Sequence, residues 1–417
     1  MTTHAMPVRP VVLTLAMLLS ACTVGPDFRR PEPPAAERYV DPTPAGEGMQ
    51  TLSLGEAPPT EWWKLFRSEA LDQIVARALQ GNRTLTAAQW TLSEAQELAN
   101  ARAGARWPQV DATAGVGREK IGAQFLGSFP KPAPFTYFSV GARVSYALDY
   151  TGGLTRSIEQ QRALVDYREQ QVEAARLAVT GNAITEALRV ASLRTQIETV
   201  EALLDRDQEN LKLVQIAFDA GSVSRLDVVS AQSQLASDTT ALSPLRQQLS
   251  EARHRLAVTL GNAPAAAAPA DLNLAQLTLP DDLPVTLPSE LARRRPDILA
   301  AEAQLHAATA AVGIAESNLY PHIDLTASLG QQSIAAADLF DSGSGVFGLA
   351  ADLVAPIFDG GKLRAQKRAS VDALHASAAN YEQTVLEAFS QVADSLEALN
   401  HGAAELQAQA NAERAAR

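Results

Sequence analysis

Residues able to do chemistry are scattered along this sequence and do not form a catalytic motif. No His-Glu-x-x-His, phosphate-binding Walker loop or nucleophile elbow occurs, and the Gly-rich pieces lack dinucleotide-binding spacing. A single cysteine, Cys22, excludes an internal disulfide framework and any zinc or iron–sulfur site built from several cysteines. The sequence therefore predicts no enzyme activity, no cofactor and no metal site. The six histidines are far apart, without metal-ligand spacing: His4, His254, His306, His322, His375 and His401.

Cys22 lies at the end of a secretory signal. A basic residue precedes an apolar stretch at 11–19, which is too short to span a bilayer core of about 30 Å. The motif Leu19-Ser20-Ala21-Cys22 resembles the bacterial lipobox, in which the thiol is diacylated and cleavage makes the cysteine the first residue. We therefore expect a signal peptide at 1–21 and lipidation of Cys22; alternatively, Cys22 is only a small apolar residue ending a signal. Thr23, in place of aspartate, favours the outer membrane over inner-membrane retention.

Composition limits the class of protein further. The 417 residues are 46% hydrophobic and 5% aromatic, with 35 Lys and Arg against 47 Asp and Glu and a net charge of −12. This apolar content is ample for a core and excludes wholesale disorder, whereas an acidic, aromatic-poor chain is a poor candidate for nucleic-acid binding. The Pro-rich segment at 22–60 predicts an extended, unpaired tether behind the lipid anchor.

The chain after this tether contains an internal duplication. The motif Arg106-Trp107-Pro108-Gln109-Val110-Asp111 recurs 213 residues later as Leu319-Tyr320-Pro321-His322-Ile323-Asp324. Gly152-Gly153, followed by Arg156, recurs 208 residues later as Gly360-Gly361, followed by Arg364. Both copies share the order helix, aromatic-Pro, strands, Gly-Gly, helix. We expect a first repeat at 61–264, a Pro-rich linker at 265–288 and a second repeat at 289–417.

Two segments of each repeat alternate apolar with small or polar residues, as β-strands do. The predicted strands cover about 109–119, 135–148, 322–332 and 345–355. Their length and alternation match transmembrane β-barrel strands, with apolar residues toward lipid and small or polar residues toward a lumen; a soluble β-sandwich is the alternative. Asp111, Asp324 and Asp352 are candidate lumen-facing residues. Because four strands cannot close a barrel and unpaired backbone in hydrocarbon is costly, we expect the protomer to pool strands with copies of itself.

A long helix follows each Gly-Gly pair. Residues 154–219 contain no proline, and a continuous helix over this segment would be roughly 99 Å long. Apolar residues in this segment recur at alternating spacings of three and four, as in a coiled coil. The segment 220–225 breaks the helix, and 226–260 is expected to return antiparallel, giving a coiled-coil hairpin at 154–260. The core of a soluble helical bundle is the alternative for this spacing.

These features together resemble the outer-membrane efflux protein family, the TolC-like channels, and most closely its lipid-anchored branch serving resistance-nodulation-division pumps. The resemblance covers essentially the whole mature chain. It implies a mainly α-helical fold with a β-barrel portion, in which a trimer forms one 12-stranded transmembrane barrel continued by an α-helical tunnel across the periplasm. The motifs that carry it are Cys22-Thr23-Val24-Gly25-Pro26-Asp27, Arg294-Arg295-Pro296-Asp297-Ile298, Tyr320-Pro321, Ala355-Pro356-Ile357-Phe358-Asp359-Gly360-Gly361 and Ala220-Gly221-Ser222-Val223-Ser224-Arg225-Leu226-Asp227-Val228.

The resemblance also implies a function and partners. The chain would be the outer-membrane channel of a tripartite efflux pump, passively conducting drugs or other small molecules. Its partners would be two further copies, a periplasmic adaptor and an inner-membrane proton-driven pump. The alternatives are a periplasmic coiled-coil scaffold or adaptor lipoprotein without its own pore, and a secreted enzyme. The family's adaptor-contact region maps onto the hairpin tip, which otherwise is only a turn: Gly221, Ser222, Val223, Ser224, Arg225 and Leu226.

The sequence departs from the family pattern near its end. A second hairpin tip, 208 residues after Gly221, would fall beyond Arg417, the last residue. We therefore expect the final return helix to be missing, and with it the family's acidic gate residues near the second tip.

Overall fold

The structure is a computed structural model that describes residues 23–32, 38–39, 51–120, 133–265, 272–280 and 282–416. The chain divides into two compact units. Unit 1 consists of residues 1–32, 93–167 and 300–384, and unit 2 consists of residues 33–92, 168–299 and 385–417. The expected signal peptide and the expected lipidation site, Cys22, lie outside the described residues.

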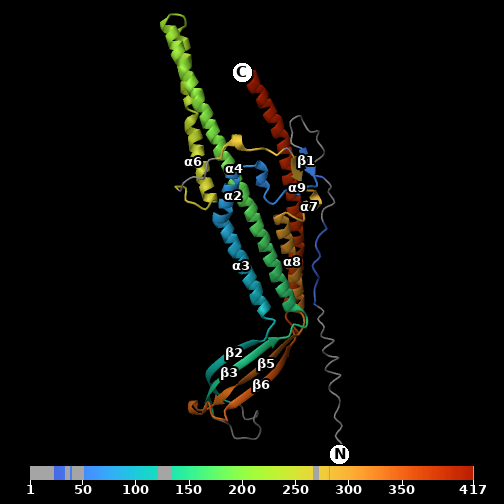
Figure 1. The fold of residues 1–417 in the computed structure, drawn as a ribbon. Coiled ribbons are helices and arrows are strands. Elements are labelled where there is room, and N and C mark those ends of the chain that lie inside the picture. Colours follow the sequence, from blue (N-terminus) through green and yellow to red (C-terminus); the bar gives the residue numbers. More distant parts are fainter. Residues whose placement is uncertain are drawn as a thin grey trace, which may run out of the picture. The chain divides into compact units, whose positions relative to one another are not determined.

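Unit 1 contains a four-stranded antiparallel sheet in the order β2-β3-β5-β6 (Figure 1). Each strand boundary lies within one residue of the expected range. β2 and β6 form the two edges, so each is paired on one side only among the described strands. The strands are β2 (Gln109–Glu119), β3 (Phe135–Ala147), β5 (His322–Ser333) and β6 (Gly345–Val354).

Each repeat passes from its second strand into a long helix through a Gly-containing turn. α4 (Gly153–Asp219) and α9 (Lys362–Ala416) are both continuous (Figure 1). The carboxylate of Asp149 accepts backbone N–H bonds from Leu154 and Thr155 at 2.9 and 2.8 Å, and that of Asp359 accepts from Gly361 and Leu363. These bonds satisfy N–H groups that a helix start leaves unpaired. In both repeats an aspartate therefore caps the start of the long helix, but the number of residues between this aspartate and the helix differs.

The described helices outside these two are shorter, and α2 and α3 are separated by a single capping residue. This residue is Asn82, whose side-chain oxygen accepts N–H bonds from Thr84 and Leu85. The remaining helices are η1 (Trp62–Phe66), α2 (Glu69–Gly81), α3 (Arg83–Gly104), α5 (Arg225–Thr239), α6 (Leu242–Thr259), η2 (Leu274–Gln276), α7 (Pro288–Leu291), α8 (Pro296–Ser317) and η3 (Ala336–Asp338). The mainly α-helical fold class with a β portion is confirmed.

The core of unit 2 lies where α2, α4 and α6 meet. Its most buried members are small or aliphatic residues from all three helices, which lets the helices approach closely. Those with at most 1% exposure are Leu71, Val75, Ala78, Ala183, Ala187 and Ala252. Between α4 and α6, Arg255 pairs with Glu186 at 3.0 Å. The antiparallel helical hairpin expected from the sequence is therefore present in this unit.

The returning arm of the hairpin is divided into α5 and α6, with Thr240 and Ala241 between them. Pro244 explains this break, because it lacks the N–H that would bond to the Thr240 carbonyl and its ring clashes with that carbonyl. The break gives the hairpin a local irregularity that the apolar spacing did not reveal.

A small parallel sheet in unit 2 corrects one expectation. β1 (Thr51–Leu54) pairs with β4 (Asp282–Val285) in the register Thr51 opposite Asp282. The N-terminal segment was expected to be an unpaired tether, but part of it forms this sheet, and Val24 also donates its N–H to the Thr151 carbonyl. Proline density favours extended backbone, and extended backbone is also able to pair with another strand.

Candidate functional site

The strand register of unit 1 gives the sheet two chemically different faces. Asp111 lies opposite Arg143, and Asp324 lies opposite Asp352. Because paired residues share a face and side chains alternate along a strand, all four lie on one face. Their neighbours on this face are mostly small or hydroxyl-bearing: Thr113, Gly115, Ser139, Gly141, Ser145, Thr326, Ser328 and Gly348. The three aspartates singled out in the sequence are therefore brought to the same side of the sheet.

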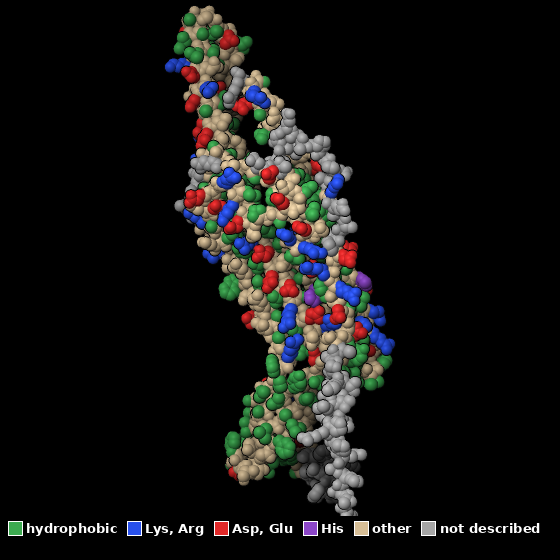
Figure 2. Space-filling view, turned by 45° about the vertical axis from the view of Figure 1, so that its right-hand side comes forward, with side chains coloured by type: hydrophobic (Ala, Val, Ile, Leu, Met, Phe, Trp, Pro, Cys, Tyr) green, Lys and Arg blue, Asp and Glu red, His purple; other side chains and the backbone are tan. Residues whose placement is uncertain are grey.

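The opposite face is apolar and exposed. Its larger members are Val110, Val116, Phe138, Val140, Leu325, Leu329, Phe347, Leu349 and Leu353. Phe347 and Leu349 are 82% and 80% exposed. Figure 2 shows hydrophobic side chains covering the strand region, whereas charged side chains gather over helices. A soluble sandwich would bury such a face, and a membrane-spanning barrel presents it to lipid.

Two glycines in the middle of the sheet show which face is concave. Gly141 lies opposite Gly330 on the polar face. A Cβ on Gly141 would lie 2.6 Å from the Leu329 carbonyl oxygen, and one on Gly330 would lie 2.5 Å from that of Val140. Glycine inside a strand marks a bend or a close approach of another backbone. Because both crowded positions lie on the polar face, we infer that the sheet bends toward this face and that the small, polar face is the concave one.

The hairpin tip joins α4 to α5 through a turn held by its own side chains. Gly221 has a φ of +72°, which favours glycine. The Ser222 hydroxyl donates to the Ala217 carbonyl at 2.8 Å, and the Ser224 hydroxyl donates to Asp227 at 2.7 Å. The bond from this hydroxyl, together with one from the Ser224 backbone N–H, holds the pKa of Asp227 below its usual value. Both serine hydroxyls thus donate their hydrogen bonds within the turn. Arg225 and Leu226 are exposed beside it.

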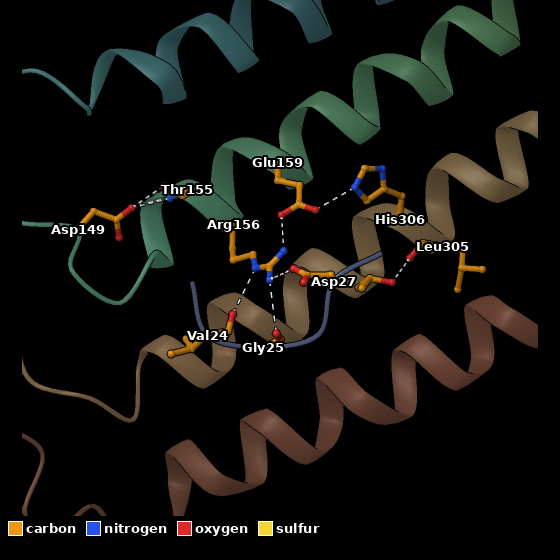
Figure 3. Close-up of polar contacts among 10 residues, drawn as sticks. Val24, Gly25, Asp27, Asp149, Thr155, Arg156, Glu159, Leu305 and His306 are labelled. Carbon is orange, nitrogen blue, oxygen red and sulfur yellow. Dashed lines mark hydrogen bonds and ion pairs between the residues drawn. The ribbon is translucent and has the colours of Figure 1, made fainter. Parts of the chain in front are cut away.

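A polar site that sequence reasoning missed holds the N-terminal segment against α4 (Figure 3). Arg156, in the first turn of α4, has a side chain only 5% exposed. Its Nη2 lies 2.6 Å from Asp27 Oδ1, and its Nη1 lies 2.8 Å from Glu159 Oε2. Its Nε donates to the Val24 carbonyl at 3.2 Å, and Nη2 also donates to that of Gly25 at 3.4 Å. One buried guanidinium therefore joins the N-terminal segment to a helix 129 residues away.

His306 on α8 extends this network. Its Nε2 lies 3.0 Å from Glu159 Oε1, and its ring stacks on Phe28 with centroids 4.3 Å apart and planes at 15°. Burial alone would raise the pKa of Glu159, but hydrogen bonds from Arg156 and His306, and their charges, hold it below its usual value. We call Val24, Gly25, Asp27 and Phe28, with Arg156, Glu159 and His306, the N-terminal docking site.

Close backbone packing fixes the same segment on α8. Gly25 has a φ of +89°, and a Cβ there would lie 2.4 Å from Gly313 Cα on α8. A Cβ on Gly313 would in turn lie 3.0 Å from the Val24 carbonyl oxygen. Both positions therefore need glycine. The sequence signal for this site was the motif that follows Cys22, because Gly25 and Asp27 belong to it. The sequence alone could not distinguish the buried Arg156 from its exposed repeat counterpart, Arg364.

Metal and catalytic sites were also searched for. In the part of the chain that the structure describes, no group of three or more His, Cys, Asp or Glu side chains is arranged to hold a metal ion. The features that stand out are the two-faced sheet, the exposed hairpin tip and the N-terminal docking site.

This combination defines a class: an outer-membrane channel subunit that contributes curved membrane strands and a long helical hairpin. The family described as "Outer membrane efflux protein" matches residues 74–262 and 287–417. The pyoverdine export outer membrane protein OpmQ of Pseudomonas aeruginosa is 33% identical over 346 residues, covering 82% of this chain and 72% of its own length. The toluene efflux pump outer membrane protein TtgF of Pseudomonas putida is 28% identical, covering 95% and 83%. The solved outer-membrane channel OprN has a TM-score of 0.83 at 29% identity, covering 94% and 87%.

The chain therefore belongs to the outer membrane efflux protein family, as its sequence motifs indicated. It is an outer-membrane channel component of an efflux system. Proteins of this family are channels that form trimers and work in tripartite pumps.

Proposed function

We propose that three copies of this chain close one 12-stranded barrel that passively conducts small molecules from the periplasm across the outer membrane. The observation that carries this proposal is the four-stranded sheet with a polar concave face, an exposed apolar convex face and two open edges. In hydrocarbon an open edge costs several kcal/mol per unpaired backbone group, so neighbouring copies must supply the missing partners. The separate family matches support a division into repeats at 61–264 and 289–417.

The concave face then lines the lumen, and its charges set the field there. Each protomer contributes Asp111, Asp324 and Asp352 and, as the balancing cation on this face, Arg143. Each copy therefore adds a net negative charge to the lumen, which favours cations over anions in the open pore. Nothing in this lining performs chemistry, so we propose that the chain is a duct and not an enzyme.

The proposed partners follow from the exposed side chains of the hairpin tip. We propose that the hairpin tip, 221–226, meets a periplasmic adaptor, with Arg225 and Leu226 as the contacting side chains because the turn does not use them. An inner-membrane pump would supply the energy, since a passive duct has no source of its own. The pump and adaptor, more than the duct, would then select substrates, which among relatives range from pyoverdine to toluene by name.

The N-terminal docking site supports the proposed lipid anchor. Docking begins at Val24, two residues after Cys22, and the Val24 N–H donates to the Thr151 carbonyl in the turn between β3 and α4. A lipid on Cys22 would thus be held where the membrane strands end, which is where an outer-membrane lipid needs to be. We propose that Cys22 is diacylated and that the docking site holds this anchor beside the barrel rim.

The test is made on outer-membrane fractions and in planar bilayers. We expect a band of trimer size that heating converts to monomer, stepwise conductance with cation preference, and restored resistance when the gene returns to a deletion strain. A Cys22→Ser variant is expected to keep conductance but to lose radiolabelled palmitate. A water-soluble monomer without conductance would contradict the proposal and would fit a periplasmic scaffold or adaptor instead.

A further inference from the structure

The junction between neighbouring protomers can be derived from a junction inside one protomer. β3 of the first repeat pairs with β5 of the second repeat within the chain. In a closed ring, the corresponding pair is β6 of one protomer with β2 of the next, because these are the two open edges. This inference rests on the trimer proposed above, and it adds the register in which the copies meet.

The two β-hairpins correspond residue by residue. Gln109 directly follows the aromatic-Pro pair of the first repeat and lies opposite Ser145. His322 directly follows that of the second repeat and lies opposite Val354. β2 therefore matches β5 at an offset of 213 residues, and β3 matches β6 at an offset of 209 residues. These offsets map polar face onto polar face and apolar face onto apolar face, as a true structural repeat requires.

The internal junction then fixes the external one. Arg143 on β3 lies opposite Ser328 on β5. The same offsets place Asp352 of one protomer opposite Gly115 of the next protomer. We propose that adjacent protomers pair β6 with β2 antiparallel in this register, so that the barrel wall is completed by a second copy of the chain. The paired residues are 348–354 of one protomer and 113–119 of its neighbour.

An aromatic residue beside each Gly-Gly pair points to the same junction. Tyr150, two residues before the first pair, donates its hydroxyl to the Pro321 carbonyl at 2.6 Å and so ties the first repeat to the second. Phe358, two residues before the second pair, is 93% exposed, and Ile357 beside it is 92% exposed. Large apolar side chains this exposed mark an interaction surface. By the repeat correspondence, Phe358 packs on Trp107-Pro108 of the neighbouring protomer, where Trp107 is 73% exposed.

Paired cysteines test the register in the full chain, in which the native Cys22 is at the anchor. In Asp352→Cys/Gly115→Cys, the two positions of one protomer lie on opposite edges, separated by three strand spacings (about 14 Å) and by a further eight residues along the strands (about 26 Å), too far for a disulfide. Between neighbouring protomers the two positions lie directly opposite each other on adjacent strands. Mild oxidation of outer-membrane fractions is therefore expected to give covalent dimers and trimers that reductant dissociates. A Cβ at Gly115 makes only an ordinary 3.5 Å contact with Ser139, so this position tolerates the change.

The matched control moves one cysteine along the same face. Asp352→Cys/Asp111→Cys shifts the pair by four residues, or about 13 Å, and is expected to give less than a tenth of the cross-linking. Leu353→Cys/Ala114→Cys repeats the expected register on the apolar face, in case the first pair fails to assemble. Efficient cross-linking of the control pair would overturn the register. So would the absence of cross-linking in both expected pairs while wild type forms heat-modifiable trimers. Either result leaves the channel proposal standing. Monomeric wild type overturns both.

Discussion

Asp324 on β5 lies directly opposite Asp352 on β6, and both carboxylates share the concave face of the sheet with Asp111 and Arg143. Like charges directly opposite each other on a sheet are destabilising. A folding argument alone would not place them there, whereas a wide, water-filled lumen both hydrates the carboxylates and uses their field. The relationship therefore points to conduction more than to stability.

The first prediction concerns this pair. Asp324→Asn/Asp352→Asn is expected to lower the cation-over-anion permeability ratio at least twofold at low salt, because two of the four acidic residues in the strands of each protomer's concave face (Asp111, Glu119, Asp324 and Asp352) lose their charge. Reversal potentials in a salt gradient measure the ratio. The thermal midpoint of the trimer should stay equal or rise slightly. Asp341→Asn, in the exposed loop between β5 and β6, is the control and should leave the ratio unchanged.

The second prediction concerns the glycines that permit curvature. Gly141→Ala puts a methyl group 2.6 Å from the Leu329 carbonyl oxygen, so the backbone must move. We expect about 1–3 kcal/mol of destabilisation, seen as less heat-modifiable trimer in the outer membrane. Gly345→Ala, on β6, meets nothing within 4 Å and should assemble normally. Equal trimer yields from the two variants would remove the argument that this face is concave.

The sequence predicted the strands well because the alternation of apolar and polar residues that marks a strand lies within the strand itself. Alternation with period two fixed each boundary to within one residue, and it assigned Asp111, Asp324 and Asp352 to the polar face without any knowledge of pairing. The division of the return arm was missed, although Pro244 was visible, because the heptad spacing of Val228, Leu235, Leu242 and Leu249 continues across the break. The pairing of β1 with β4 depends on segments some 230 residues apart, for which periodicity carries no signal.

The N-terminal docking site was missed for a related reason. Arg156 was visible as a repeat marker, and His306 was treated as one of six isolated histidines. Neither residue's surroundings can be read from its own helix alone. Arg156 shares α4 with Glu159, but Asp27 comes from the N-terminal segment, and His306 reaches Glu159 from α8. Long-range polar networks of this kind are specified by packing, which sequence patterns do not encode.

The third prediction tests the docking site by removing its central cation. Arg156→Ala leaves two carboxylates and two carbonyls without their donor. We expect about 2 kcal/mol of lost docking stability, or roughly 30-fold more frequent opening of residues 23–32. Limited proteolysis of that segment in membranes measures it. Arg162→Ala, on an exposed face of the same helix, should leave the proteolysis rate as in wild type.

The fourth prediction tests the hairpin tip as an adaptor contact. Leu226→Asp places a charge on a side chain that is 72% exposed and that the turn does not use. We expect trimer yield and bilayer conductance to be unchanged, and efflux of a fluorescent substrate in cells to fall at least fivefold. Ser222→Ala, which removes only a hydrogen bond within the turn, should have a smaller effect. If both variants retain full efflux, the tip is a turn without a partner role.

The fifth prediction follows from the depressed pKa of Glu159. A carboxylate whose folded-state pKa lies below its unfolded value, 4.5 here, stabilises docking above that pH, and the contribution is lost as pH falls through the folded-state pKa. Hydrogen exchange at residues 23–32, corrected for intrinsic rates, should therefore keep its protection from pH 7 to 5 and lose it below about 4.5. In Glu159→Gln protection should be lower at pH 7 and should lack this acid-dependent loss. Glu169→Gln, exposed on the same helix, is the control and should follow wild type. Because Glu159 alone links Arg156 to His306 in this network, an unchanged acid profile in Glu159→Gln would assign the pH dependence to other groups and leave the docking site with a purely steric role.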